Sequence, residues 1–89
     1  MKLTAYTIYD VQADRFNTPM FLANDAVAIR QIKNELLNPN SQISLSPEDF
    51  KIYKNGEYDD ETGEITSINP TLVTEVKDIQ LPQLKEVNS

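Results

Sequence analysis

The sequence predicts a small α+β domain, with an antiparallel sheet of about four or five strands and one main helix packed on one face. Two stretches, Leu3–Tyr9 and Phe50–Tyr58, are rich in the β-branched and aromatic residues that favour strands. The stretch Asp25–Leu37 has helical spacing of apolar residues, and Asp60–Gly63 has the composition of a hairpin turn. All of these signals are consistent with the same small α+β fold.

The length of 89 residues leaves room for one modest core. We expect a single domain over residues 1–76. Residues 77–89 contain Pro82, show weak periodicity and end in polar residues, so we expect a loosely ordered C-terminal tail there.

The N-terminal region predicts two strands joined as a hairpin. Leu3–Tyr9 is apolar on both faces, which is typical of a central strand. Asp10–Arg15 is polar and turn-like, and Phe16–Ala23 resumes an extended pattern. Pro19 within this second strand indicates an edge or a bulge.

The main helix is expected over Asp25–Leu37. Asn24 is a good N-cap, and the charge of Asp25 suits the first turn. Pro39 stops the helix within the segment Asn38–Ser41, because proline disfavours helical geometry in the preceding residue. One apolar stripe faces the sheet and consists of Ala28, Ile29, Ile32 and Leu36.

The middle of the chain predicts one helical turn and then a strand. Ser46 is an expected N-cap with proline at the first helical position, so Ser46–Asp49 forms a single turn. In the strand Phe50–Tyr58, Phe50 and Ile52 share one face, and Lys51 and Tyr53 share the other. The Asn55-Gly56 pair indicates a bulge within it.

The third region predicts a second hairpin. Asp60–Gly63 fits a type I turn, with Gly63 supplying a positive φ. Glu64–Ile68 returns antiparallel, Asn69-Pro70 is expected to break that strand, and Leu72–Val76 is expected to form a further one with an unpaired edge.

Composition argues against catalysis. The chain has no cysteine and no histidine, which removes thiolate nucleophiles, the commonest general base and the commonest metal ligand. Two glycines cannot build a phosphate-cradling loop. We therefore expect no enzyme activity, no cofactor and no metal. No apolar run is long enough to span a membrane, which favours a reducing cytoplasm.

The net charge of −6 is unevenly distributed. Residues 1–54 hold six basic and six acidic side chains, whereas residues 55–89 hold two lysines and eight acids. A polyanion would be repelled by the C-terminal part and could approach only the neutral part.

A nucleic-acid-binding patch is one hypothesis for the neutral part. Bases stack on exposed aromatic side chains of strands, and nearby cations neutralise phosphates. The competing interpretation is ordinary packing of the aromatics and solvated surface charge. The candidate residues are Tyr6, Tyr9, Arg15, Arg30, Lys33, Lys51, Tyr53 and Lys54.

The acidic run at the second hairpin is a candidate partner surface. Its spacing does not match a calcium loop. It is read either as a solvated hairpin tip or as a mimic of nucleic-acid phosphates that occupies a basic groove of a partner. Its residues are Glu57, Asp59, Asp60, Glu61 and Glu64.

Several short segments occur in a fixed order over about residues 4–66: Tyr6–Asp10, Pro19–Phe21, Asn24-Asp25, the helix with Ala28 and Arg30, Asn38–Ser41, Pro47–Phe50, Lys51–Tyr53 and Gly56–Gly63. Their order and spacing resemble the small non-structural protein of gokushovirus-type microviruses, which are tailless phages with single-stranded DNA. Members often carry a histidine just before the Pro-Glu-Asp element, where this chain has Ser46.

The resemblance implies a non-enzymatic phage protein of the host cytoplasm that acts in single-stranded genome replication or packaging. It offers no catalytic residues. Weak contact with single-stranded DNA is one route, and action through phage replication or packaging proteins is another. The alternative is an acidic protein–protein interaction module, either a homo-oligomer (we expect a dimer) or an inhibitor of a host DNA-binding protein.

Overall fold

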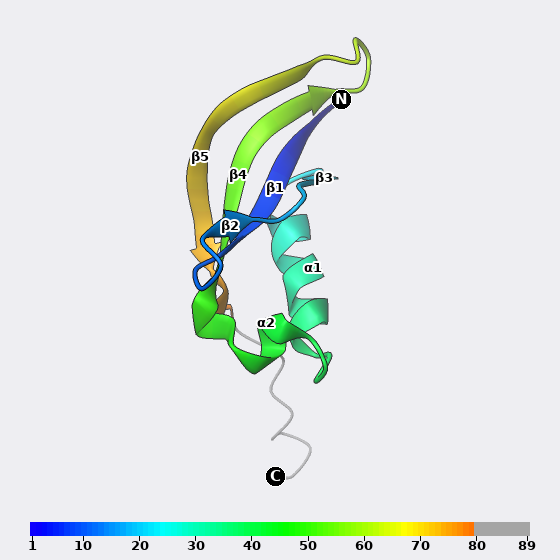
Figure 1. Cartoon of the computed structure of the whole chain (residues 1–89). Helices are drawn as coiled ribbons and strands as arrows, with labels where there is room; N and C mark the ends of the chain where they lie inside the picture. The colour runs from blue at the N-terminus through cyan, green and yellow to red at the C-terminus, as the bar shows by residue number, and fades with distance from the viewer. Residues whose placement is uncertain (80–89) are drawn as a thin grey trace.

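A computed structural model describes residues 1–79, which form a curved antiparallel sheet with a helix on its concave side (Figure 1). The predicted α+β class and five-stranded sheet are confirmed. Most of the expected tail over residues 77–89 lies outside the described residues. The elements are β1 (Lys2–Asp10), β2 (Arg15–Phe16), β3 (Met20–Leu22), α1 (Asp25–Leu36), α2 (Gln42–Leu45), η1 (Pro47–Asp49), β4 (Phe50–Asp59), β5 (Ile65–Glu75) and η2 (Val76–Asp78).

Strand β1 is the centre of the sheet, as predicted. The strand order is β2-β1-β4-β5, and β3 pairs with another part of β1. The pairing of β1 with β4 extends from Lys2 opposite Asp59 to Asp10 opposite Phe50. Because β1 has neighbours on both sides, all four residues from Ala5 to Ile8 are buried. The four-residue loop between β1 and β2 aligns Tyr9 with Phe16.

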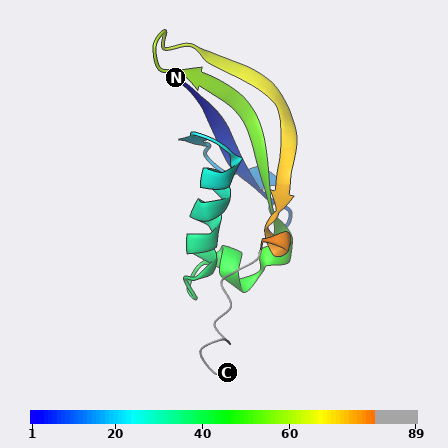
Figure 2. The ribbon, with the colours of Figure 1, turned by 180° about the vertical axis from the view of Figure 1, so that it is seen from behind.

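Helix α1 packs its apolar stripe on the concave face of the sheet, where it completes the core (Figure 2). The N-cap is confirmed, since the side chain of Asn24 accepts a 3.0 Å hydrogen bond from the backbone N–H of Val27. Within the described residues, no helix is long and apolar enough to cross a membrane. The buried core residues are Tyr6, Ile8, Ala28, Ile32, Ile43, Phe50, Ile52 and Val76.

A short helix, α2, was not predicted. The side chain of Ser41 accepts a 3.2 Å hydrogen bond from the backbone N–H of Ile43, which starts the turn and brings Ile43 into the core. The single helical turn after Ser46 is confirmed as η1, but the side chain of Ser46 makes no capping hydrogen bond. Instead, its backbone carbonyl accepts a 3.0 Å bond from Asp49.

The predicted bulge in β4 is confirmed. The register between β1 and β4 shifts at Asn55, because Ala5 pairs with Gly56 whereas Tyr6 pairs with Lys54. Gly56 leaves little room for a side chain, since a Cβ atom there would lie 3.0 Å from the backbone oxygen of Thr66 in β5.

The expected break at Asn69-Pro70 is wrong. Residues Ile65–Glu75 form one continuous strand that contains Pro70. Strand β5 lies at the edge of the sheet, where a missing N–H need not cost a ladder hydrogen bond. The register shift between the pairs Lys54–Thr71 and Gly56–Ser67 accommodates the extra residues of β5.

The hairpin turn between β4 and β5 begins one residue earlier than predicted. The carboxylate of Asp59, not that of Asp60, accepts a 2.9 Å bond from the backbone N–H of Glu61. The carbonyl of Asp59 also accepts a 2.7 Å bond from Gly63. The positive φ expected of Gly63 is confirmed at 77°.

Candidate nucleic-acid interface

The sheet has one face covered by α1 and one face over which no described helix lies (Figures 1 and 2). Side chains alternate along a strand, so the burial of Tyr6 and Ile8 against α1 directs Thr7 and Tyr9 to the opposite side. We call this opposite, convex side the outer face. Exposure varies along this face: Thr7 is buried, whereas Phe16 is 48% exposed.

Three aromatic side chains from three strands meet on the outer face. Tyr9 of β1 pairs with Phe16 of β2, and Tyr53 of β4 pairs with Thr7 of β1. The ring centroids are 4.8 Å apart for Tyr9 and Phe16, 5.6 Å for Phe16 and Tyr53, and 6.2 Å for Tyr9 and Tyr53. We call Tyr9, Phe16 and Tyr53 the aromatic cluster. Their mutual tilts are those that aromatic pairs prefer.

A second aromatic pair lies further along the same face. The rings of Phe21 in β3 and Tyr58 in β4 are 5.8 Å apart. Both residues pair with outer-face positions of β1, Phe21 with Ala5 and Tyr58 with Leu3. Aromatic surface is therefore present at both ends of the outer face.

The ring of Tyr9 is held in place by its hydroxyl group. The hydroxyl donates a hydrogen bond to the carboxylate of Asp14 in the β1–β2 loop. Asp14 has φ of 54°, a left-handed conformation that aspartate tolerates better than most residues. The bond to Asp14 raises the pKa of the Tyr9 hydroxyl.

The charges beside the aromatic cluster nearly balance. Lys51 pairs with Tyr9 across the β1–β4 ladder and shares its face. Lys51 pairs on its other side with Glu75, whose carboxylate lies 3.7 Å from the ammonium of Lys77. Attraction of phosphate to this surface is therefore small, and stacking must provide most of any binding energy.

Several predicted binding residues lie elsewhere. Lys54 pairs with Tyr6 on the face that α1 covers, and its ammonium lies 3.7 Å from the carboxylate of Asp25. Arg30 and Lys33 belong to α1, on the other side of the sheet. Arg15 is exposed in β2 and donates a 3.0 Å hydrogen bond to the carbonyl of Asp14. Of the eight predicted residues, the outer face brings together Tyr9, Lys51 and Tyr53.

Tyr6 was a candidate for base stacking, with ordinary packing as the competing interpretation, and the structure buries it. It is 1% exposed and belongs to the core. Its hydroxyl donates a 2.5 Å hydrogen bond to Oδ1 of Asp25. Burial, together with that bond, raises the pKa of Tyr6 to about 12. No base can stack on this ring while the domain is folded.

Phe16 is the member of the cluster that sequence reasoning did not select. The sequence places it in a strand, but nothing local marks it as functional. The length of the β1–β2 loop could have identified Phe16, because a short hairpin loop places it directly across from Tyr9.

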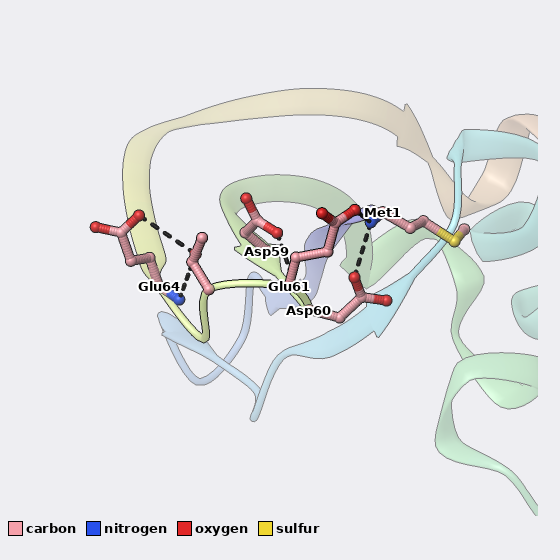
Figure 3. A network of polar contacts seen from close by, with 6 residues as sticks. Met1, Asp59, Asp60, Glu61 and Glu64 are labelled. Atoms are coloured by element: carbon pink, nitrogen blue, oxygen red, sulfur yellow. Dashed lines mark hydrogen bonds and ion pairs between the residues drawn. The ribbon is translucent and has the colours of Figure 1, made fainter.

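The acidic residues of the second hairpin form an ordered tip (Figure 3). The α-amino group of Met1 lies 2.7 Å from the carboxylate of Asp60 and 3.1 Å from that of Glu61, and both contacts raise its pKa. The backbone N–H of Glu61 lowers the pKa of Asp59. The hydroxyl of Thr62 donates a 3.3 Å hydrogen bond to the carboxylate of Glu64.

Glu57 lies within β4 opposite Thr4 and Thr66, and it lines a small pocket together with Asp59 and Glu64 of the tip. Over residues 1–79, no group of acidic side chains is arranged to hold a metal ion.

A pocket of about 500 Å³ is lined by none of the residues of the aromatic cluster. It opens between the β1–β2 loop, α2 and η1, with Asp10, Gln42 and Asp49 in its wall. The backbone N–H of Val11 donates a 2.9 Å bond to the carbonyl of Asp49 at this place.

The fold and the outer face thus define a small α+β protein with an exposed aromatic sheet surface. Residues 3–79 match the family model described as Phage ORF5 protein. The chain belongs to this family and is a bacteriophage protein. No curated protein and no solved structure matches it.

Proposed function

We propose that this chain is a non-structural, non-enzymatic protein of a gokushovirus-type microvirus. It acts in the host cytoplasm in replication or packaging of the single-stranded DNA genome, and it binds single-stranded DNA weakly with its outer face. The phage family supports the origin. The aromatic cluster on a face that no described helix covers is the observation that supports the binding mode.

Stacking on aromatic side chains is the common way in which sheets bind single strands. Each stacked base contributes about 1–3 kcal/mol, and the sequence of the strand matters little. In the aromatic cluster, Phe16 offers the most open ring at 48% exposure. Tyr9 and Tyr53 meet it at tilted and edge-on angles, so the three rings do not stack face to face.

The acidic tip does not block this surface. At about 3.3 Å per residue, roughly 26 Å of β4 separates Lys51 from Asp59. That exceeds the Debye length of about 8 Å at physiological salt several times over. The tip instead repels a DNA strand from that end of the sheet, which favours contact at the end that holds the aromatic cluster (Figure 1).

Fluorescence anisotropy of a labelled oligothymidylate, titrated with protein at low and at physiological salt, tests the proposal. We expect micromolar binding that weakens only slightly with salt, since Lys51 is the one predicted cation that shares the outer face. Phe16→Ser should raise Kd about tenfold. Leu37→Ser, which removes an exposed apolar side chain at the end of α1, is the matched control and should leave Kd unchanged.

A matched pair also tests the electrostatic part. Lys51→Gln should weaken binding at low salt, whereas Lys33→Gln, which removes the same charge from α1, should not. Equal effects of both changes would mean that only net charge matters and that the outer face is not the site. No binding at low salt would overturn direct DNA contact and leave phage replication or packaging proteins as the partner.

A second proposal concerns the acidic tip as a surface for a basic protein partner. The side chain of Glu61 is 79% exposed, and over residues 1–79 its only ion pair is with the α-amino group of Met1. Asp60→Asn with Glu61→Gln should abolish capture of a basic partner from infected cells. Glu35→Gln in α1 is the control, and capture that survives the tip changes would exclude this role.

A further inference from the structure

We propose that the exposed part of β5, Ile65–Leu72, pairs antiparallel with the same strand of a second copy of this chain. The two sheets then continue into one another across a two-fold axis. The pairing itself does not depend on DNA binding.

The edge of β5 is available for such pairing. Over residues 1–79, β5 pairs with β4 alone and ends the strand order. Figures 1 and 2 show it along the outside of the sheet. Every residue from Ile65 to Leu72 is exposed. A free strand edge presents a row of N–H and C=O groups that another strand can pair with.

The composition of this edge favours pairing with another strand. No residue from Ile65 to Thr74 is charged, although edges are commonly protected by lysine or other charges. Ile65, Ile68 and Leu72 are 69%, 38% and 47% exposed. Pro70 and the register shift between the pairs Lys54–Thr71 and Gly56–Ser67 are the protective features. In a pairing centred near Ile68, Pro70 lies opposite Thr66 and lacks an N–H to donate there.

Charge identifies a second copy as the occupant. The edge offers a basic or an acidic partner no opposite charge, so it selects an uncharged edge such as itself. Two-fold pairing of identical strands is antiparallel, which sends the two acidic tips to opposite ends. With the axis near Ile68, the two Glu64 residues lie about 26 Å apart at roughly 3.3 Å per residue. Repulsion between the tips is then largely screened.

This arrangement also has a consequence for the outer face, which rests on the proposed function. A two-fold axis perpendicular to a continuous sheet keeps both outer faces on the same side. The aromatic clusters of the two copies then belong to one surface, and a single strand of DNA can cross both.

Sedimentation velocity of the full chain tests the pairing. We expect a dimer at micromolar concentration. Ile68→Lys brings two like charges together at the axis and should give monomers, whereas Leu37→Lys makes the same change in net charge at the end of α1 and should remain dimeric. A monomer at all concentrations up to millimolar would overturn the proposal, as would a dimer that Ile68→Lys leaves intact.

The absence of native cysteine allows a second test that does not require disrupting the interface. Single cysteines are introduced in turn at Ser67, Ile68 and Asn69, and at Leu37 as the control. Residues opposite each other in an antiparallel pair lie about 4.5–5.5 Å apart, within reach of a disulfide. Mild oxidation should cross-link one or two of the β5 variants and not the control, and a control that cross-links equally well would contradict the pairing.

The two proposals fail in different ways. A monomer that still binds oligothymidylate through Phe16 would refute the β5 pairing alone. A dimer that binds no DNA would refute the binding mode alone.

Discussion

The hydroxyl group of Tyr6 donates a 2.5 Å hydrogen bond to Oδ1 of Asp25, which joins the middle of the central strand to the first residue of α1. The other carboxylate oxygen of Asp25 lies 3.7 Å from the ammonium of Lys54 in β4. Three elements, β1, α1 and β4, thus meet at one carboxylate. This contact adds to the core packing that holds α1 on the concave side of the sheet.

Removing this hydroxyl should weaken the domain. Tyr6→Phe deletes a hydrogen bond to a charged group, and we expect the free energy of unfolding to fall by about 1–2 kcal/mol in urea denaturation. Asp25 is about half exposed and can bind water instead, which limits the loss. Tyr58→Phe is the control, since no hydrogen bond from its hydroxyl is seen within residues 1–79. Equal effects of the two changes would contradict the importance of the Tyr6–Asp25 contact.

Stability should also depend on alkaline pH through Tyr6. Its pKa is about 12 in the folded chain and near 10 when unfolded. The unfolded chain therefore loses the proton first, so the contribution is complete below pH 10 and is lost as pH rises from about 10 to 12. The loss amounts to about 2–3 kcal/mol. Urea titrations across this range should show a steeper decline for the unmodified protein than for Tyr6→Phe, and parallel declines would refute it.

The two predicted N-caps should differ in energy. The side chain of Asn24 makes its capping bond, so Asn24→Ala should lower the free energy of unfolding by about 1 kcal/mol. The side chain of Ser46 makes none, so Ser46→Ala should change it by less than about 0.5 kcal/mol. Chemical denaturation of both variants measures the difference. A larger effect at Ser46 would contradict the capping geometry.

The two glycines should respond differently to alanine. At Gly56 a methyl group would meet the backbone oxygen of Thr66 at 3.0 Å, and the neighbouring strand must move, at a cost of about 1–3 kcal/mol. At Gly63 the methyl group enters open space, and only the positive φ costs about 1 kcal/mol. Thermal unfolding should rank Gly56→Ala below Gly63→Ala, and amide shifts should move at Thr66 only for the former.

The sequence was most informative where local chemistry decides the structure. The N-cap at Asn24, the bulge at Asn55 and the positive φ of Gly63 each depend on a few neighbouring residues, and all three predictions are confirmed. Pro70 was misinterpreted because its tolerance depends on β5 being an edge strand, which is a property of the whole sheet. Helix α2 was missed because its four residues have too little periodicity to register.

The candidate site was only partly predictable for the same reason. Lys51 and Tyr53 share a strand face, and that alternation was correct. Alternation along β4 places Lys54 on the face that α1 covers, opposite Tyr6. The bulge at Asn55 follows Lys54 and does not change this placement. The hypothesis grouped Lys54 and Tyr6 with Lys51 in one patch, because it did not assign each basic or aromatic residue to a face of the sheet. Predicting the burial of Tyr6 would have required knowing where α1 packs.

The central claim is that single-stranded DNA contacts the outer face. Its most direct test is a nuclear magnetic resonance titration of isotope-labelled protein with oligothymidylate at low salt. We predict shift changes and ring-current effects at Tyr9, Phe16, Lys51 and Tyr53, with α1 and the acidic tip unaffected. Changes confined to Arg30 and Lys33 of α1, or the absence of any change, would contradict the claim.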